Sequence, residues 1–275
     1  MRSKIVFLLL TVVFAVGMSL LVQPVQATII LEGSDAIGFH SGGNAAATAY
    51  RDQVWLALSG ADSRPIAIIG HQPVSAGTIG TSTHPITAFE TVAAAGSLSD
   101  FVALYFLAGG GCCVEDDTLI TAPGAQAAVS AYLAGGGTVM IENYIGGAAW
   151  DFAVGAGGVG NAHVAGYEGG LPGAGCSDNE RVTADGIANG FTQPSAMGCW
   201  THQAYDTAFF GPLGFTHTFF DAGVDYPAGF SSLLSNGFTE TGGGGGGAVP
   251  EPSTLLLLGM GLTGLGGFTF ARRRR

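Results

Sequence analysis

Four cysteines are the side chains best suited to covalent chemistry in this chain, and they are Cys112, Cys113, Cys176 and Cys199. Their number is even, and in an oxidising compartment such a set is expected to form two disulfides. Adjacent cysteines rarely bond each other, because neighbouring positions strain the bridge. We therefore expect Cys112 and Cys113 each to bond one of the two later cysteines, in a pairing that the sequence leaves open.

The densest acidic cluster consists of Glu115, Asp116 and Asp117, whose oxygens would suit calcium. The cluster lacks the alternate spacing and the distal glutamate of an EF-hand loop. Acidic residues here also suit the start of a helix, because they complement the helix dipole. These three residues are weak metal candidates, and the sequence predicts no cofactor.

The six histidines are scattered, without the short spacing of a metal site. His84 and His202 could line a pocket at the ends of strands, where α/β folds bind ligands. Solvated or hydrogen-bonded loop histidines are the favoured interpretation. No nucleophile, base and orienting residue can be recognised as a set, so the sequence assigns no catalytic residue and leans against an enzyme.

The elements that would position these groups alternate between strands and helices. We predict strands at 28–31, 65–70, 100–107 and 138–142, and helices at 45–58 and 124–134. A strand, a helix and a strand in this order predict parallel pairing, and continuous apolar strands imply helices on both faces of a sheet. Beyond residue 148 no period is recognisable, so we expect a loop-rich second half.

Three segments resemble the class I glutamine amidotransferase-like group. They are Phe101 to Leu107, Gln126 to Leu133 and the phrase Gly-Gly-Gly-Thr-Val-Met-Ile. The resemblance implies a flavodoxin-like three-layer α/β domain with a parallel sheet. It also makes Cys112 or Cys113 the counterpart of that group's nucleophile. The acidic residues that follow would raise a thiol pKa, and no late His-x-Glu pair supplies a base, so the resemblance extends to the fold alone.

Both ends of the chain look like targeting segments. Residues 1–27 start with Arg2 and Lys4, continue as an apolar stretch and end with small residues up to Ala27. This pattern is typical of a signal peptide, and we predict cleavage by signal peptidase before Thr28. An uncleaved anchor is the alternative.

The C-terminal residues 249–275 have three parts in a fixed order. A Pro-Glu-Pro triplet precedes an apolar segment long enough for a short transmembrane helix, and arginines that belong on the cytoplasmic side follow it. The sorting motif is Val249, Pro250, Glu251 and Pro252, and the membrane stop is Arg272, Arg273, Arg274 and Arg275. A glycine spacer at 242–248 separates this tail from an exported globular domain at 28–241.

This tail resembles the PEP-CTERM sorting signal. The resemblance implies that an exosortase, a membrane-embedded transpeptidase similar to cysteine proteases, recognises the triplet and cleaves there. It also implies a Gram-negative host that makes exopolysaccharide, and a final location in the cell envelope, on the outer surface or in the extracellular matrix. A plain tail anchor is the alternative.

The charge distribution excludes one class of partner. Arg51, Arg64 and Arg181 are the only basic residues between 28 and 250, whereas all but one of the 20 acidic residues lie there. A surface this acidic repels phosphate backbones, so nucleic acid is not expected to bind.

The leading hypothesis is an exported, exosortase-processed envelope or exopolysaccharide-matrix protein that is non-catalytic or binds a ligand. Its partners would be signal peptidase, exosortase, the membrane before processing and a possible polysaccharide. The alternatives are an exported hydrolase or amidase and a calcium-stabilised glycan-binding module. Convergence of Glu142, Asn143, His202 and Cys112 at the mouth of the sheet would favour the enzyme.

Overall fold

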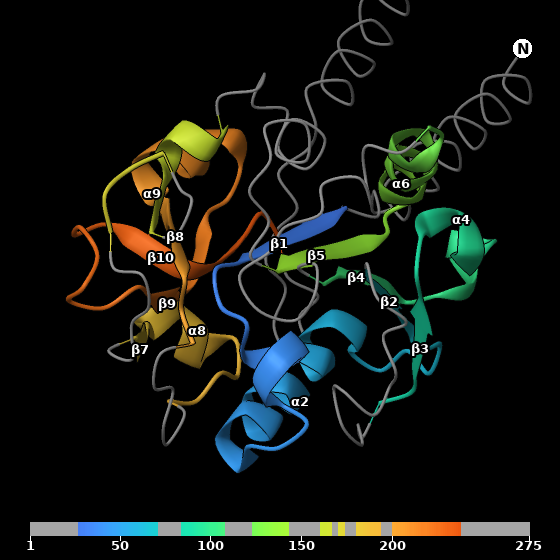
Figure 1. The fold of residues 1–275 in the computed structure, drawn as a ribbon, viewed down its shortest axis with the longest axis horizontal. Coiled ribbons are helices and arrows are strands. Elements are labelled where there is room, and N and C mark those ends of the chain that lie inside the picture. Colours follow the sequence, from blue (N-terminus) through green and yellow to red (C-terminus); the bar gives the residue numbers. More distant parts are fainter. Residues whose placement is uncertain are drawn as a thin grey trace, which may run out of the picture. The chain divides into compact units, whose positions relative to one another are not determined.

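A ten-stranded mixed sheet forms the centre of the fold in the computed structural model (Figure 1). The structure describes residues 27–70, 84–107, 123–142, 160–166, 170–173, 180–193 and 200–237. They belong to one unit that spans Pro24–Gly242. Within these ranges, no helix has the length and apolar character that crossing a membrane requires. The predicted signal segment, glycine spacer and sorting tail lie outside the described residues, apart from Ala27.

Five strands of the sheet are parallel and stand in the order β3-β2-β4-β5-β1. They are β1 (Thr28–Glu32), β2 (Ile66–Ile69), β3 (Ile86–Phe89), β4 (Ala103–Phe106) and β5 (Thr138–Glu142). All but the edge strand β3 are fully buried, which explains their nearly continuous apolar sequences. The four strands predicted from the sequence are therefore confirmed, within a few residues of their expected bounds.

Helices connect β1 to β2, β3 to β4 and β4 to β5, because a parallel connection must cross from one end of the sheet to the other. Most of the connection from β2 to β3 lies outside the described residues. The connecting helices are α2 (Ala45–Ser59), α4 (Val92–Ala95), the 3₁₀ turn η2 (Leu98–Asp100) and α6 (Ala125–Ala134). The helices predicted at 45–58 and 124–134 are confirmed.

The second half of the body is antiparallel, which corrects the prediction of a parallel, flavodoxin-like sheet. Its strands are β6 (Val164–Gly166), β7 (Arg181–Val182), β8 (Gln203–Asp206), β9 (His217–Asp221) and β10 (Phe230–Ser235). Strand β10 pairs antiparallel with β1, β8 and β9. Strand β6 pairs with β8, and β7 pairs with β9, both antiparallel. The region predicted to be loop-rich therefore completes the sheet. The short elements η3 (Gly160–His163), α8 (Ala184–Ala188), α9 (Thr207–Phe210) and η4 (Gly211–Leu213) accompany these strands.

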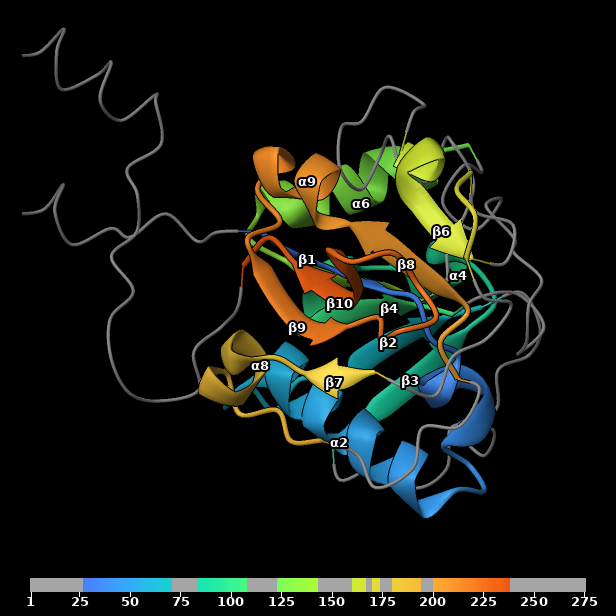
Figure 2. The ribbon, with the colours of Figure 1, turned by 90° about the vertical axis from the view of Figure 1, so that its left-hand side faces the viewer.

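The sheet lies between two layers of helices (Figures 1 and 2). Helices α4, α6 and α9 lie on one side of the sheet, and α2 and α8 lie on the other. Successive side chains of a strand point to opposite faces. Ile29 and Leu31 accordingly join the core beside α6, whereas Ile30 and its neighbour Met140 join the core beside α2. Two residues further along, β1 and β5 each place a glutamate on the α2 side.

Asn44 caps the N-terminus of α2. Its Oδ1 accepts hydrogen bonds from the backbone N–H groups of Ala46 at 2.9 Å and Ala47 at 3.2 Å. We expect Asn44→Ala to lower the free energy of unfolding by about 1 kcal/mol, because these two N–H groups lose their acceptor. Asn44→Asp keeps the acceptor and should change stability little. Urea denaturation measures both variants, and equal losses in the two would contradict the capping role.

Candidate functional site

Two glutamates end adjacent parallel strands at the same edge of the sheet. Glu32 is the last residue of β1 and Glu142 the last residue of β5, and the two are partners in the register of these strands. Neighbouring strands lie about 4.8 Å apart, so side chains on one face come close together. Both glutamates are completely buried. The carboxyl ends of parallel strands are where α/β sheets bind ligands, which makes this pair the centre of the candidate site.

Two hydroxyl groups hold the carboxyl group of Glu32. The Oγ of Ser34 donates a hydrogen bond to Glu32 Oε1 at 2.7 Å. Tyr50, on the buried side of α2, forms a second side-chain hydrogen bond with the same carboxyl. Helix α2 therefore fixes the position of Glu32 as well as covering the sheet.

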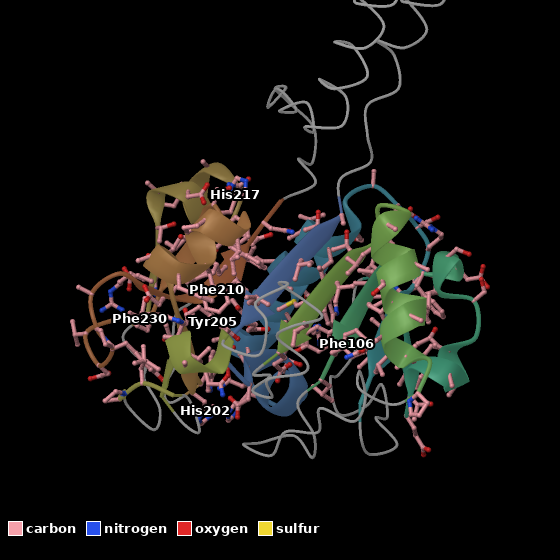
Figure 3. The ribbon with its side chains drawn as sticks, turned by 90° about the horizontal axis from the view of Figure 1, so that it is seen from above. Phe106, His202, Tyr205, Phe210, His217 and Phe230 are labelled. Atoms are coloured by element: carbon pink, nitrogen blue, oxygen red, sulfur yellow. The ribbon has the colours of Figure 1, made fainter. Side chains whose placement is uncertain are left out.

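Gly33 brings the segment before β8 against the end of β1. A Cβ at this position would lie 1.8 Å from the carbonyl oxygen of Gln203, so only glycine allows the approach. The carbonyl of Gly33 accepts hydrogen bonds from the backbone N–H groups of His202 at 2.7 Å and Gln203 at 2.9 Å. His202 consequently lies at the carboxyl edge, while His217 lies at the opposite end of the sheet (Figure 3).

A short π-helix, η1 (Ala36–His40), packs over Glu142. A Cβ at Gly38 would lie 2.8 Å from Glu142 Oε1 and 2.0 Å from Leu107 Cδ1, so a larger residue would not fit. Ala36 and Ile37 of the same helix are completely buried. Such π-helical turns are rare and are frequently found at functional sites.

Asp35 joins two histidines at this edge. Its Oδ2 lies 3.2 Å from His202 Nε2, and its Oδ1 lies 3.4 Å from His40 Nε2. The Asp35 side chain is 1% exposed and that of His202 8%, whereas that of His40 is 30% exposed. The His40 ring also lies 5.6 Å from the ring of Trp200. His40 is thus the member of this trio that meets the solvent.

Burial controls the protonation of the two glutamates. It raises the pKa of Glu32 from 4.5 to about 8, although the hydrogen bonds to its carboxyl act in the other direction. Burial, followed by the charges of Glu32 and Asp35, raises the pKa of Glu142 well above its ordinary value. Glu32 is therefore mainly neutral at pH 7 and can donate a proton as well as accept one, and the shift of the Glu142 pKa favours the neutral form in the same way. Burial also raises the pKa of Tyr50 well above its ordinary value, so its hydroxyl remains a donor.

The site holds an excess of buried carboxyl groups. Glu180 is a fourth buried acid, and its charge acts on Tyr50. Arg51 of α2 is also buried, but its guanidinium pairs with Asp52 at 2.8 Å. Among the described residues, no three histidine, cysteine or acidic side chains are arranged to hold a metal ion. The raised pKa values of Glu32 and Glu142 suit this edge to proton uptake and release.

A cavity of about 490 Å³ lies at the opposite, amino edge of the parallel strands. Its polar groups already serve the protein itself. Arg64 pairs with Asp62 at 2.7 Å and donates to the carbonyl of Ser99 at 2.7 Å, while the hydroxyl of Tyr132 donates to the carbonyl of Val102 at 2.9 Å. We therefore place the candidate site at the carboxyl edge.

The enzyme hypothesis needs Glu142, Asn143, His202 and Cys112 to converge at the carboxyl edge. The structure brings two of them, Glu142 and His202, together through Asp35. His84 does not join them, because it precedes β3 and its Nε2 lies 2.9 Å from the carbonyl oxygen of Arg64 at the other edge. His84 is thus a hydrogen-bonded loop histidine, as the favoured interpretation predicts, and the alternative that placed it in a pocket at the ligand-binding edge is wrong. The remaining candidates lie outside the described residues, and they are Asn143, Cys112, Cys113, Cys176, Cys199, Glu115, Asp116 and Asp117.

Sequence reasoning missed Glu32, Asp35 and Tyr50 as site residues. A signal for the first of them was present, because β1 reads Thr-Ile-Ile-Leu-Glu and β5 reads Thr-Val-Met-Ile-Glu. Each strand is an apolar run that ends in a glutamate, and parallel pairing in the observed register places the two glutamates side by side. The hydrogen bond between Tyr50 and Glu32 depends on how α2 packs against the sheet, and no pattern in the sequence indicates it.

Comparison with known proteins identifies the tail. The family described as the PEP-CTERM protein-sorting motif matches residues 248–275. No curated protein and no solved structure matches the chain. The predicted sorting motif is thus confirmed, and it indicates an exported protein that an exosortase processes at the cell envelope. The resemblance to glutamine amidotransferase-like domains gains no support from these comparisons.

Proposed function

We propose that this protein is exported, held at the membrane by its C-terminal tail and then released from that tail by an exosortase. Signal peptidase would remove residues 1–27. The mature body would act in the envelope or the exopolysaccharide matrix of a Gram-negative bacterium, as a non-catalytic or ligand-binding protein. The observation that carries this proposal is the match of the sorting motif to residues 248–275.

The sequence of the triplet supports its use as a protease substrate. Proline fixes its own φ angle and disfavours a helical conformation in the residue before it. Residues from Val249 to Pro252 therefore favour an extended, polyproline-like backbone, which is the form that proteases and transpeptidases bind.

Composition of the body supports a location outside the cytoplasm. Its acidity would attract divalent cations or basic partners outside the cell. The even number of cysteines suits an oxidising compartment, where Cys112 and Cys113 would each bond one of Cys176 and Cys199. Both features agree with export.

The packing at the carboxyl edge supports a non-catalytic body. Glu32 and Glu142 are completely buried, and η1 lies in the place where a ligand would approach them. A substrate could reach these carboxyl groups only after η1 had moved. In the observed conformation, η1 covers the carboxyl group of Glu142.

An exported hydrolase acting on a saccharide or a peptide is the second candidate. The observation that favours it is the position of Glu142, whose pKa burial raises, beside Glu32 and the Asp35–His202 pair. Acid–base catalysis uses groups with shifted pKa values. A hydrolytic activity of the purified protein that Glu142→Gln abolished without unfolding it would establish this function.

Two host strains that differ only in the exosortase gene test the proposal. With an antibody against the body, we expect a shorter form in the envelope or medium of the strain that has the enzyme. The strain without it should hold the tail-bearing form in its inner membrane. Full-length protein of equal abundance and location in both strains would contradict exosortase processing.

A further inference from the structure

The π-helix η1 closes directly over the carboxyl pair at the ends of β1 and β5. The backbone of Gly38 approaches Glu142 so closely that a Cβ would lie 2.8 Å and 3.0 Å from its two carboxyl oxygens. Neither oxygen of Glu142 forms a hydrogen bond of good geometry with the described residues. The N–H of Gly38 lies near enough to lower the pKa, but burial outweighs it. The closed helix therefore surrounds Glu142 with few groups that would favour its charged form.

Charged and titratable groups face this pair from every element packed against it. They are Tyr50 and Arg51 of α2, Asp35 and His40 at η1, His202 before β8 and Glu180 before β7. The basic side chains among them already contact carboxyl groups, because Arg51 pairs with Asp52 and both histidines lie beside Asp35. Ionisation of both glutamates would place like charges on adjacent strands in a buried site, which is unfavourable.

We propose that η1 is a proton-dependent lid, which stays closed while Glu32 and Glu142 are neutral and opens when they ionise. Opening would expose the carboxyl edge of the parallel strands, where this kind of sheet binds ligands. The proposal concerns the body alone, and it holds whether or not an exosortase removes the tail. It gives the buried carboxyl groups a regulatory role that extends beyond the envelope function.

Proton linkage determines how steeply the opening of η1 depends on pH. With η1 open, hydrated glutamates would return to their ordinary pKa near 4.5, whereas with η1 closed the pKa of Glu32 is about 8. Between these two values, opening releases a proton that the closed form keeps. The equilibrium constant for opening should therefore rise about tenfold per pH unit for each proton released, and the contribution of Glu32 should level off above about pH 8.

Amide hydrogen exchange of the protein purified from its host tests the lid. We expect the protection of Ala36–His40, corrected for the intrinsic rate, to fall at least about tenfold per pH unit between about pH 5 and pH 8. The amides of β2, an inner strand that pairs with β3 and β4, should remain better protected at every pH. Equal protection of η1 and β2 across the range would indicate unfolding of the whole molecule and overturn the proposal.

Variants identify the carboxyl groups that cause the pH dependence of the protection of η1. In the double variant Glu32→Gln and Glu142→Gln, the protection of η1 should become nearly independent of pH. Glu90→Gln removes an exposed carboxyl after β3 and should reproduce the wild-type profile. A double variant that keeps the wild-type fall in protection would overturn the proposal. If the double variant fails to fold, the wild-type profile decides alone, because constant protection from pH 5 to pH 8 is incompatible with the lid.

Discussion

At pH 8.5, the Glu32→Gln variant is expected to be more stable than the wild-type protein by about 3–5 kcal/mol, and near pH 4 the two should be similar. The cause is the pKa of Glu32, which burial raises from 4.5 to about 8. A pKa difference of one between the folded and unfolded states corresponds to about 1.4 kcal/mol. The unfolded chain releases this proton near pH 4.5, whereas the folded protein keeps it until about pH 8. Stability is therefore lost as the pH rises through this interval.

Glutamine is the informative replacement because it matches glutamic acid in shape and remains neutral at every pH. Its carbonyl oxygen can still accept the hydrogen bonds from Ser34 and Tyr50. Urea denaturation at a series of pH values from 4 to 9 gives the difference in the free energy of unfolding between variant and wild type.

Glu90→Gln is the matched control for this stability measurement, since Glu90 is exposed and its replacement should leave the pH profile unchanged. A Glu32→Gln variant that was less stable than the wild-type protein at pH 8.5 would contradict the assignment. That result would mean that the folded protein holds Glu32 in its charged form and gains stability from it.

Replacement of the Pro-Glu-Pro triplet by alanines at Pro250, Glu251 and Pro252 should change the cellular fate of most of the protein. We expect the short, released form to disappear and a tail-bearing, membrane-bound form to take its place. The reason is that the triplet presents the extended backbone that a transpeptidase must bind, and alanine allows other conformations. An immunoblot of membrane and released fractions with an antibody against the body measures the ratio of the two forms.

The control for this prediction is Glu240→Ala, which removes a carboxylate from the chain upstream of the glycine spacer and leaves the triplet intact. It should be processed as efficiently as the wild-type protein. Release of equal amounts of short protein from the triplet variant and the control would show that cleavage does not depend on the triplet.

The parallel half of the fold could be predicted from the sequence because its signals are local. Strands such as Thr138–Glu142 are continuous apolar runs, and the three glycines before it mark the end of α6. Burial on both faces makes nearly every residue of such a strand apolar. A short, continuous apolar run of this kind can be recognised in the sequence.

The antiparallel half could not be predicted in the same way. Its strands are short, and β9 reads His-Thr-Phe-Phe-Asp while β10 reads Phe-Ser-Ser-Leu-Leu-Ser, so neither shows a long apolar run or a strict alternation. The shifts in register between β9 and β10 break the alternation further. Their place in the sheet depends on pairing with β1, which is more than 200 residues away from β10 along the chain.

The site was predictable only in part, because its chemistry depends on burial. A glutamate at the end of an apolar strand can be located in the sequence, and Glu142 was considered for that reason. The raised pKa values of Glu32 and Glu142, however, follow from the packing of η1 and α2 above them. The contact that brings Asp35 to His202 needs the close approach at Gly33, which no local pattern reveals.

The intact mass of the protein isolated from its own host tests the central claim most directly. Our account predicts a chain that begins at Thr28 and lacks everything beyond the Pro-Glu-Pro triplet, including the four terminal arginines. A chain that retained Arg275 would instead identify the tail as a permanent anchor and contradict processing by an exosortase.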